Sequence, residues 1–187
     1  DGMALSAVGL IFENLRTAYR DGNNLEAREK MALASTYAGF AFTRANVGYV
    51  HAIAHQFGGK YHTPHGLANA IMLPYVLRYS LPAIAGRLAL LAVRAGVGSE
   101  DESAEVLAEK FLDAVDQLNA DLGIPAFLET LREADIPDLA RAACWEAHTG
   151  YPVPRYMSQE VCEGIIRQAL PKAQAKTRQA AARKKSD

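Results

Sequence analysis

The chain has 187 residues, of which 50% are hydrophobic and 22% are charged, and its formal net charge is −1 at pH 7. This length and balance suit one soluble domain with a sizeable core, and the near-zero charge gives no indication of nucleic-acid or anionic-membrane binding. No apolar run reaches the roughly 20 residues of a membrane span, and no signal peptide opens the chain. Two isolated cysteines, Cys144 and Cys162, indicate reduced thiols in a cytoplasmic protein.

Apolar residues at helical spacing predict a first helix over residues 4–20. A turn follows, and Asn24 is a candidate cap for a second helix. We expect that helix to continue through an alanine-rich stretch as far as His55, and to stop at the pair Gly58-Gly59.

The second half of the chain also has helical patterns. A buried helix is predicted from Gly66, with a kink at Pro74, and Pro82 is expected to open a new helix that ends at Gly96 and Gly98. Ser99 or Asp101 is the candidate cap of a long helix through Leu118, and Ser158 caps the last helix, through Leu170. Shorter helices are predicted over 127–134 and 136–148.

The pattern contains no alternation long enough for a strand. The predicted fold class is therefore all-α, a multi-helix bundle, with one helical domain over residues 1–170. A basic tail follows over residues 171–187, which we interpret as a frayed or solvated end.

Four of the five histidines lie within the fifteen residues from His51 to His65. His51 and His55 are four apart, so a helix places both imidazoles on one face. Thr63-Pro64 forces an extended step, which puts His65 near the start of the next helix. Neutral imidazole is a good ligand for first-row divalent metals, so this spacing indicates a metal site. On spacing alone, ordinary hydrogen-bonded histidines remain the alternative.

The stretch from Gly48 to Ser80 closely resembles the signature of the iron-containing alcohol dehydrogenases. The family pattern is a histidine, three residues, a second histidine, a Pro-His-Gly-x-x-x-Ala segment and then Leu-Pro. The matching positions here are His51, His55, Pro64-His65-Gly66, Ala70 and Leu73-Pro74. A weaker likeness continues to about Leu170. The resemblance implies the C-terminal helical domain of this family, which is similar to the α domain of dehydroquinate synthase.

This resemblance implies part of a nicotinamide-dependent alcohol dehydrogenase. In the family a divalent metal, usually Fe2+ and sometimes Zn2+, polarises the substrate oxygen while hydride passes to or from NAD(P). By position, His51 and His65 match two metal ligands, and His55 matches a histidine near the nicotinamide that has been considered a proton relay. His62 and His148 match no family role, and we expect both to be structural.

The chain departs from the family in one respect. The other two metal ligands of the family form an Asp-x-x-x-His pair upstream, and no such pair precedes His51 here. No Gly-rich phosphate-binding turn is present, so NAD(P) is expected to bind mainly to an N-terminal domain that this chain lacks. Two histidines are fewer than the three protein ligands of a typical catalytic site. The chain alone is therefore expected to bind metal weakly and not to catalyse.

Two alternatives follow from these gaps. The chain could be a non-catalytic helical interaction or assembly module derived from this domain. A zinc hydrolase using His51, His55 and His65 would need an acidic residue nearby as base, and the histidine segment contains none. The start at Asp1, without methionine, favours a piece of a longer enzyme. Its exposed apolar surface is expected to promote a homo-oligomer, and its substrate is expected to be a small alcohol or aldehyde.

Overall fold

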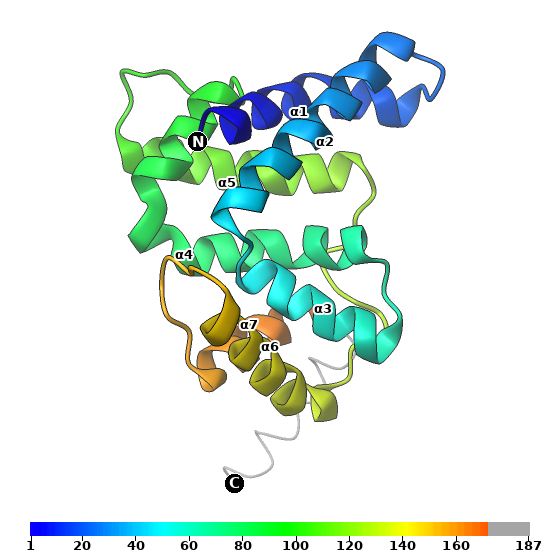
Figure 1. Ribbon diagram of the computed structural model, residues 1–187, viewed down its shortest axis with the longest axis vertical. Helices are drawn as coiled ribbons and strands as arrows, with labels where there is room; N and C mark the ends of the chain where they lie inside the picture. The colour runs from blue at the N-terminus through cyan, green and yellow to red at the C-terminus, as the bar shows by residue number, and fades with distance from the viewer. Residues whose placement is uncertain (172–187) are drawn as a thin grey trace, which may run out of the picture. The chain divides into compact units, whose positions relative to one another are not determined.

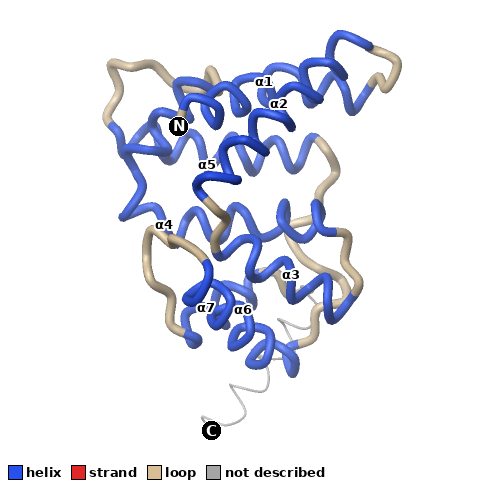
Figure 2. The backbone as a smooth tube through the Cα atoms, in the orientation of Figure 1, coloured by secondary structure: helices blue, strands red, loops and turns tan. Residues whose placement is uncertain are grey.

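A computed structural model describes residues 1–171. Within them the chain forms seven α-helices and one short 3-10 helix and contains no β-strand (Figures 1 and 2). The all-α prediction is therefore confirmed. The predicted basic tail, apart from Pro171, lies outside the described residues.

The described residues group into two compact units. The first unit comprises residues 1–47 and 77–124, and the second comprises residues 48–76 and, among the described residues, 125–171. Each unit has its own buried side chains and is considered by itself below. The prediction of a single domain over residues 1–170 stays a prediction.

In the first unit, helices α1 (Gly2–Arg20) and α2 (Leu25–Ala45) lie side by side (Figure 1). Small residues on their buried faces allow this close approach, namely Ala7, Gly9, Ala27 and Ala34. The predicted cap is present, because the side-chain oxygen of Asn24 accepts a hydrogen bond of 3.0 Å from the N–H of Ala27.

The predicted second helix is broken before it reaches the histidines. α2 ends at Ala45, and a new helix, α3 (Tyr49–Tyr61), begins after three non-helical residues. Asn46 has a φ of 62° and its side chain accepts a 2.9 Å hydrogen bond from the N–H of Val47. An asparagine side chain can compete in this way with the helical hydrogen bonds, which is why the helix stops here.

α3 also continues past the glycine pair that was predicted to end it. Its C-terminal cap is His62, which adopts the left-handed conformation with a φ of 55°. The N–H of His62 donates to the carbonyl of Gly58 over 3.0 Å, which closes the last turn. Glycine lowers the stability of a helix interior but does not forbid it, so Gly58 and Gly59 remain helical.

The prediction that Pro82 opens a new helix is wrong. A single helix, α4 (His65–Arg94), runs through both Pro74 and Pro82 and contributes residues to both units. Proline removes one backbone donor, but its fixed φ near −65° is compatible with helical geometry. The helix ends as predicted near Gly96, whose φ of 71° suits a residue without a side chain.

α4 is long and apolar enough to cross a membrane, judged by length and composition only. The prediction from apolar runs did not register it, because Arg78 and the prolines interrupt the segment. Core helices of soluble proteins have the same length and composition, so this feature does not distinguish between the two settings.

The remaining helices match the prediction in part. α5 (Ala104–Asp121) is capped by Ser103 rather than by Ser99 or Asp101, since the Ser103 hydroxyl oxygen accepts from the N–H of Val106 over 3.3 Å. The helix predicted over 127–134 is absent, and only a 3-10 turn, η1 (Glu133–Asp135), forms near its end.

The second unit is built on α3, α6 (Ile136–Gly150) and α7 (Gln159–Gln168), with Ser158 capping α7 as predicted. α6 packs against both α3 and α7 (Figure 1). The core of this unit consists of apolar side chains that are almost completely buried, namely Ile53, Phe57, Ile71, Met72, Leu131, Ile136, Met157, Cys162 and Ile166.

Candidate functional site

Three histidines of the second unit lie close together. His51 and His55 sit one turn apart on α3, and His65 is the first residue of α4, directly after the extended Thr63-Pro64 step. The ring centroids of His51 and His65 are 5.3 Å apart, those of His55 and His65 are 5.4 Å apart, and those of His51 and His55 are 5.9 Å apart. The structure therefore brings together all three histidines that the sequence singled out.

The turn between α3 and α4 explains why His65 meets the other two. His62 takes the left-handed conformation, and the N–H of Thr63 reaches back to the carbonyl of Phe57 at 3.5 Å. The N–H of Ala68 then donates to the carbonyl of Pro64 over 3.0 Å and starts α4. The chain thus reverses within a few residues, and the exposed side chain of His62 is left outside the three-ring group.

The electrostatic environment favours a neutral His51. Its burial, followed by the neighbouring His65 and His55, lowers the pKa of His51 below its ordinary value of 6.5, while Glu146 acts in the opposite direction. Burial disfavours the charged imidazolium because it removes water from around it. A neutral imidazole has a free lone pair, which is the form that can bind a metal.

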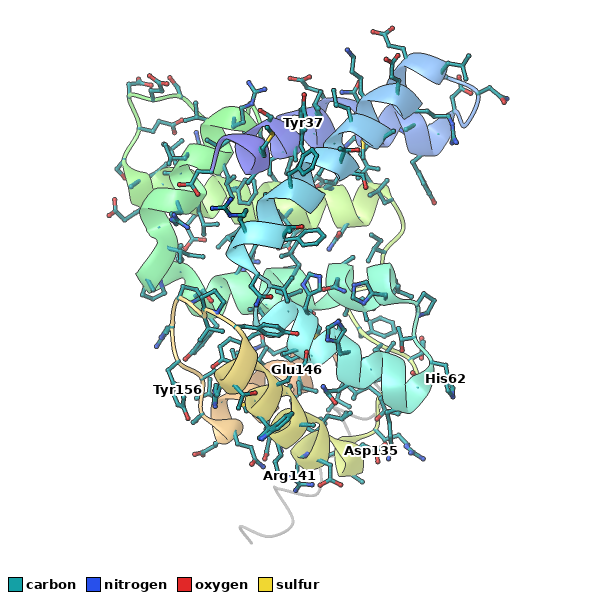
Figure 3. The ribbon with its side chains drawn as sticks, viewed as in Figure 1. Tyr37, His62, Asp135, Arg141, Glu146 and Tyr156 are labelled. Atoms are coloured by element: carbon teal, nitrogen blue, oxygen red, sulfur yellow. The ribbon has the colours of Figure 1, made fainter. Side chains whose placement is uncertain are left out.

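Glu146 is the residue of this site that sequence reasoning missed. It lies in the last turns of α6, beside α3 (Figure 3). Its Oε1 lies 2.7 Å from Nδ1 of His55, and the same oxygen accepts a hydrogen bond of 2.6 Å from the Tyr151 hydroxyl. Its Oε2 accepts one of 2.9 Å from Nε2 of Gln56. No local sequence signal pointed to Glu146, because His55 lies 91 residues away in the chain.

Tyr151 is held in its protonated form by this arrangement. The hydrogen bond to Glu146, with burial as a second cause, raises the pKa of Tyr151 to about 12. A phenol that donates to a carboxylate resists ionisation, because the phenolate would face a like charge. Tyr151 therefore remains a hydrogen-bond donor to Glu146 across the physiological pH range.

A second group of contacts fixes the other end of α3. The Tyr61 hydroxyl donates to Oδ2 of Asp135 over 2.8 Å, and Lys60 forms an ion pair with Oδ1 of Asp135 at 3.3 Å. The Arg132 guanidinium also binds Asp135, at 2.8 Å. α3 is thus attached to the start of α6 here and to its end at Glu146, which fixes the helix that bears two of the three histidines.

His148 belongs to a different network. Its Nε2 lies 2.8 Å from the Tyr49 hydroxyl oxygen and 3.2 Å from the carbonyl of Met157, and its ring stacks on Tyr156 with centroids 4.3 Å apart. The N–H of Met157 donates to the same Tyr49 oxygen over 2.9 Å. These contacts join α3, α6 and the loop before α7, and they support the predicted structural role of His148.

The geometry of two histidines fits a shared metal ion. Two imidazoles that bind one tetrahedral ion at about 2.1 Å have ring centroids about 5 Å apart, close to the 5.3 Å between His51 and His65. In the present arrangement Nε2 of His65 faces the amide of Asn69 at 3.2 Å, so a cation at that nitrogen would have to displace this long contact.

A complete set of ligands is not present in this chain's described part. Among residues 1–171, no group of three or more His, Cys, Asp or Glu side chains is arranged to hold a metal ion. The third ring, His55, is engaged through Nδ1 with Glu146 instead. The residues present therefore fit a two-histidine portion of a metal site, and further ligands would have to come from elsewhere.

The structure removes part of the objection to the zinc-hydrolase alternative, which was that no acidic residue lies near the histidines. An acidic residue does lie beside the histidines, because α6 brings Glu146 to His55. Both oxygens of that carboxylate, however, already accept hydrogen bonds from protein donors, including Gln56 and Tyr151. This arrangement suits a residue that orients its neighbours better than a base that activates water.

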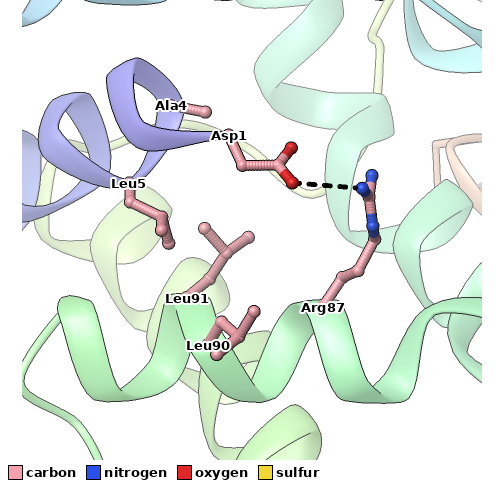
Figure 4. A pocket seen from close by; sticks show the side chains of 6 residues that line it. All are labelled: Asp1, Ala4, Leu5, Arg87, Leu90 and Leu91. Carbon is pink, nitrogen blue, oxygen red and sulfur yellow. Dashed lines mark hydrogen bonds and ion pairs between the residues drawn. The ribbon is translucent and has the colours of Figure 1, made fainter.

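A pocket in the first unit has a different, mainly aliphatic lining. It has a volume of about 160 Å³ and is lined by Asp1, Ala4, Leu5, Arg87, Leu90 and Leu91 (Figure 4). Asp1 and Arg87 form a 3.4 Å ion pair at its edge, and the rest of its wall is aliphatic. Nothing in this lining resembles a catalytic or metal-binding group.

Comparisons with known proteins agree with the motif. The family model described as "Fe-containing alcohol dehydrogenase family, C-terminal" matches residues 1–170. The chain is 44% identical over 172 residues to 1,3-propanediol dehydrogenase of Citrobacter freundii, which covers 91% of this chain and 44% of that relative. It is 38% identical over 152 residues to lactaldehyde reductase of Escherichia coli K12, covering 80% of this chain and 39% of that relative.

A comparison of the fold with solved structures agrees with this family match. A crystal structure of 1,3-propanediol oxidoreductase superimposes with a TM-score of 0.86 at 43% sequence identity, and the match covers 91% of this chain and 45% of that one. The helical fold described above is therefore similar to part of a solved oxidoreductase. In each case the chain spans less than half the length of the relative it matches.

Proposed function

The chain belongs to the Fe-containing alcohol dehydrogenase family, and we propose that it is the helical, metal-binding domain of a nicotinamide-dependent alcohol dehydrogenase. The reaction interconverts a small alcohol and an aldehyde or ketone. The observation that carries this proposal is the grouping of the rings of His51, His55 and His65, with centroids 5.3 to 5.9 Å apart. The names of the relatives, which refer to 1,3-propanediol and lactaldehyde, support a small substrate.

Each histidine has a role in this proposal. His51 and His65 would hold the divalent cation, Fe2+ or Zn2+, which would supply Lewis-acid polarisation of the substrate oxygen. A bound NAD(P) would supply the hydride acceptor or donor, and residues outside this chain would bind most of it. The lowered pKa of His51 supports its assignment, because a neutral ring has the lone pair that a ligand needs.

His55 handles the proton. In alcohol oxidation the substrate loses a hydride from carbon and a proton from oxygen, and His55 accepts that proton directly or through a water. Its Nδ1 is occupied by Glu146, so Nε2 is the nitrogen that exchanges the proton. In the reverse direction the same nitrogen returns the proton to the alkoxide oxygen.

Metal binding by the purified chain tests the ligand assignment. We expect Zn2+, or Fe2+ without oxygen, to bind weakly in a calorimetric titration, because only two ligands are in place. His51→Ala and His65→Ala should each weaken binding by at least about tenfold, the smaller end of what even outer-shell substitutions cost at metal sites. The matched control is His62→Asn, which keeps a residue suited to the left-handed conformation and lies outside the ring group. Equal affinity in all four chains would remove the ligand assignment.

Turnover by the chain tests the incomplete-site prediction separately. With NAD or NADP and 1,3-propanediol, the 187-residue chain is expected to show no metal-dependent alcohol oxidation. Turnover that depends on His51 would mean that this chain supplies a complete metal site. A third ligand within the chain would then have to be identified.

A second candidate, a non-catalytic assembly module, is favoured by one observation, the lack of a three-ligand group within residues 1–171. It predicts that no metal binds in a manner that depends on His51, while the chain still associates with itself in sedimentation. Metal binding that is lost in His51→Ala would decide against it.

A further inference from the structure

Glu146 has more hydrogen-bond donors around it than a helix-to-helix contact requires. Three side chains lie within hydrogen-bond distance of its two oxygens, from α3 and from the loop after α6. Two of them, Gln56 and Tyr151, have no acid-base role in the proposed reaction. The third is His55, the residue to which that proposal gives the proton. The carboxylate is three-quarters buried, with 24% of its side-chain surface exposed, and the His55 ring is 41% exposed.

We propose that Glu146 is the positioning residue of His55, and that it holds the imidazole in the Nδ1–H tautomer so that Nε2 carries the free lone pair. A carboxylate can only accept a hydrogen bond, so the nitrogen 2.7 Å from Oε1 must be the one that bears the proton. In the neutral ring the other nitrogen is then necessarily unprotonated. This inference deepens the proposed function and rests on it for its chemical purpose, but the tautomer itself can be measured without catalysis.

The other two donors explain how the carboxylate keeps its direction. Gln56 follows His55 directly on α3 and binds Oε2 at 2.9 Å, which turns Oε1 toward the imidazole. The Tyr151 hydroxyl donates to Oε1 at 2.6 Å. With both oxygens engaged, the carboxylate group has little freedom to rotate. The orientation of the His55 ring is thereby set from α6 as well as from its own helix.

The fixed orientation of the His55 ring, which lies beside His65, determines which ring atom is presented for proton transfer. The two rings are stacked, with an interplanar angle of 22° and centroids 5.4 Å apart. A change of tautomer would place an N–H, and a flip of the ring a C–H, where a proton acceptor is required for alcohol oxidation. Fixing the tautomer therefore removes the unproductive form of the relay before the substrate arrives.

The experiment is a long-range proton–nitrogen correlation spectrum of the 187-residue chain labelled with 15N in its histidines. It is recorded roughly two pH units above the ordinary histidine pKa of about 6.5, where imidazoles are neutral. The two nitrogens of a neutral ring resonate far apart, so the spectrum reports which one bears the proton. We expect His55 to be mainly in the Nδ1–H form. In Glu146→Leu, the ratio of this form to the Nε2–H form should fall by at least about tenfold, because a charge-assisted hydrogen bond has been removed.

Two further variants keep the test decisive. Glu146→Gln preserves the side-chain volume but offers one acceptor oxygen to three donors, so an intermediate ratio is expected. Tyr151→Phe removes a donor and leaves the acceptor for His55, so the Nδ1–H form should persist. The signals of His148, which lies in the separate Tyr49 network, report whether each variant keeps its fold.

A His55 tautomer ratio that is the same in the unmodified chain, Glu146→Leu and Glu146→Gln would overturn the inference, as would a dominant Nε2–H form in the unmodified chain. The proposed function fails differently. If the histidines bind no metal while the tautomer follows Glu146 as expected, the positioning stands and the assignment of His51 and His65 as metal ligands does not.

Discussion

The two compact units of this chain differ in how polar groups are used. In the first unit the ion pair of Arg78 with Asp113 and Asp116 lies on the surface, with all three side chains substantially exposed, while Arg16 and Asp121 form a partly buried pair. In the second unit, polar side chains join helices at partly buried positions, as Glu146 and Tyr49 do. All five histidines also lie in the second unit. A surface ion pair contributes little and orients nothing, whereas a buried hydrogen bond fixes a geometry.

The apolar side chains show the same difference. The first unit exposes several large ones, most of them on α1, α2 and α4, namely Met3, Tyr19, Leu25, Leu33, Phe40, Phe42, Leu90 and Val106. In the second unit the exposed large apolar side chains are Trp145, Tyr156 and Val161. The first unit therefore exposes more large apolar side chains than the second, which contains all five histidines. The predictions below test this contrast.

Two phenylalanines, one in each unit, should give the largest difference. Phe57 is completely buried, while Phe40 is 60% exposed. Phe57→Ala is expected to lower the free energy of unfolding by about 3–5 kcal/mol, because it leaves a cavity in the core. Phe40→Ala should change it by no more than about 0.5 kcal/mol. Urea denaturation of both variants measures this, and equal losses would mean that the Phe40 face is buried in solution by another chain.

Loss of the Tyr49 hydrogen bonds should give the second-largest effect on the free energy of unfolding. Tyr49→Phe removes the hydroxyl oxygen that accepts from the buried N–H of Met157, so we expect a loss of about 1–3 kcal/mol in unfolding free energy. The His148 ring signals should shift, and those of His55 should not. The control is Tyr19→Phe in the first unit, whose side chain is 62% exposed and should change stability by less than about 0.5 kcal/mol. An unchanged free energy of unfolding in Tyr49→Phe would show that water replaces the lost acceptor.

Helix caps should contribute equally to the free energy of unfolding in both units, because a cap depends on local geometry. Asn24→Ala in the first unit and Ser158→Ala in the second are each expected to cost about 1 kcal/mol of unfolding free energy. The observed cap hydrogen bonds are 3.0 Å and 3.3 Å long. A loss confined to one variant would indicate that tertiary packing, rather than the cap, begins that helix.

The smallest effects should appear at acidic pH. A hydrogen bond from Arg16 lowers the pKa of Asp121 in the first unit, and one from Tyr61 lowers the pKa of Asp135 in the second, both below the ordinary 3.8. Each folded-state pKa lies below the unfolded value. Each group therefore contributes stability above about pH 3.8 that is lost as the pH falls through its folded pKa.

Carboxyl NMR titrations separate the two units here. Arg16→Leu should raise the pKa of Asp121 and leave that of Asp135 unchanged. Tyr61→Phe should raise the pKa of Asp135 and leave that of Asp121 unchanged. Stability measured in Asp121→Asn and Asp135→Asn should depend less on pH in the acidic range than in the unmodified chain. If either carboxyl kept its pKa after losing its partner, the hydrogen bond would not be its cause.

Local patterns predicted most of the helices correctly. The apolar spacing of residues 4–20, the Asn24 cap, the helix beginning at Ile136 and the Ser158 cap all depend on neighbours within a few residues. The errors fell where two local signals competed. Asn46 ended a helix that the alanine-rich composition favoured, and Pro82 did not end one, because its φ still suits a helix.

The histidine group was predictable for the same reason. The spacing of His51 and His55 and the Thr63-Pro64 step before His65 are local features, and so is the family motif that contains them. Their approach to one another requires only a helix, a short turn and the start of the next helix. The sequence alone therefore determined that these three rings would gather, and which family they belong to.

Only the tertiary structure decided how the rings are held. Glu146 reaches His55 across 91 residues, and Asp135 reaches Tyr61 across 74, because α6 packs along α3. Such contacts depend on how two helix faces pack together, and a carboxylate on an amphipathic helix shows no sign of its partner in the sequence. Helical periodicity predicts that a side chain faces the interior or the solvent, but packing alone determines which donor it meets there.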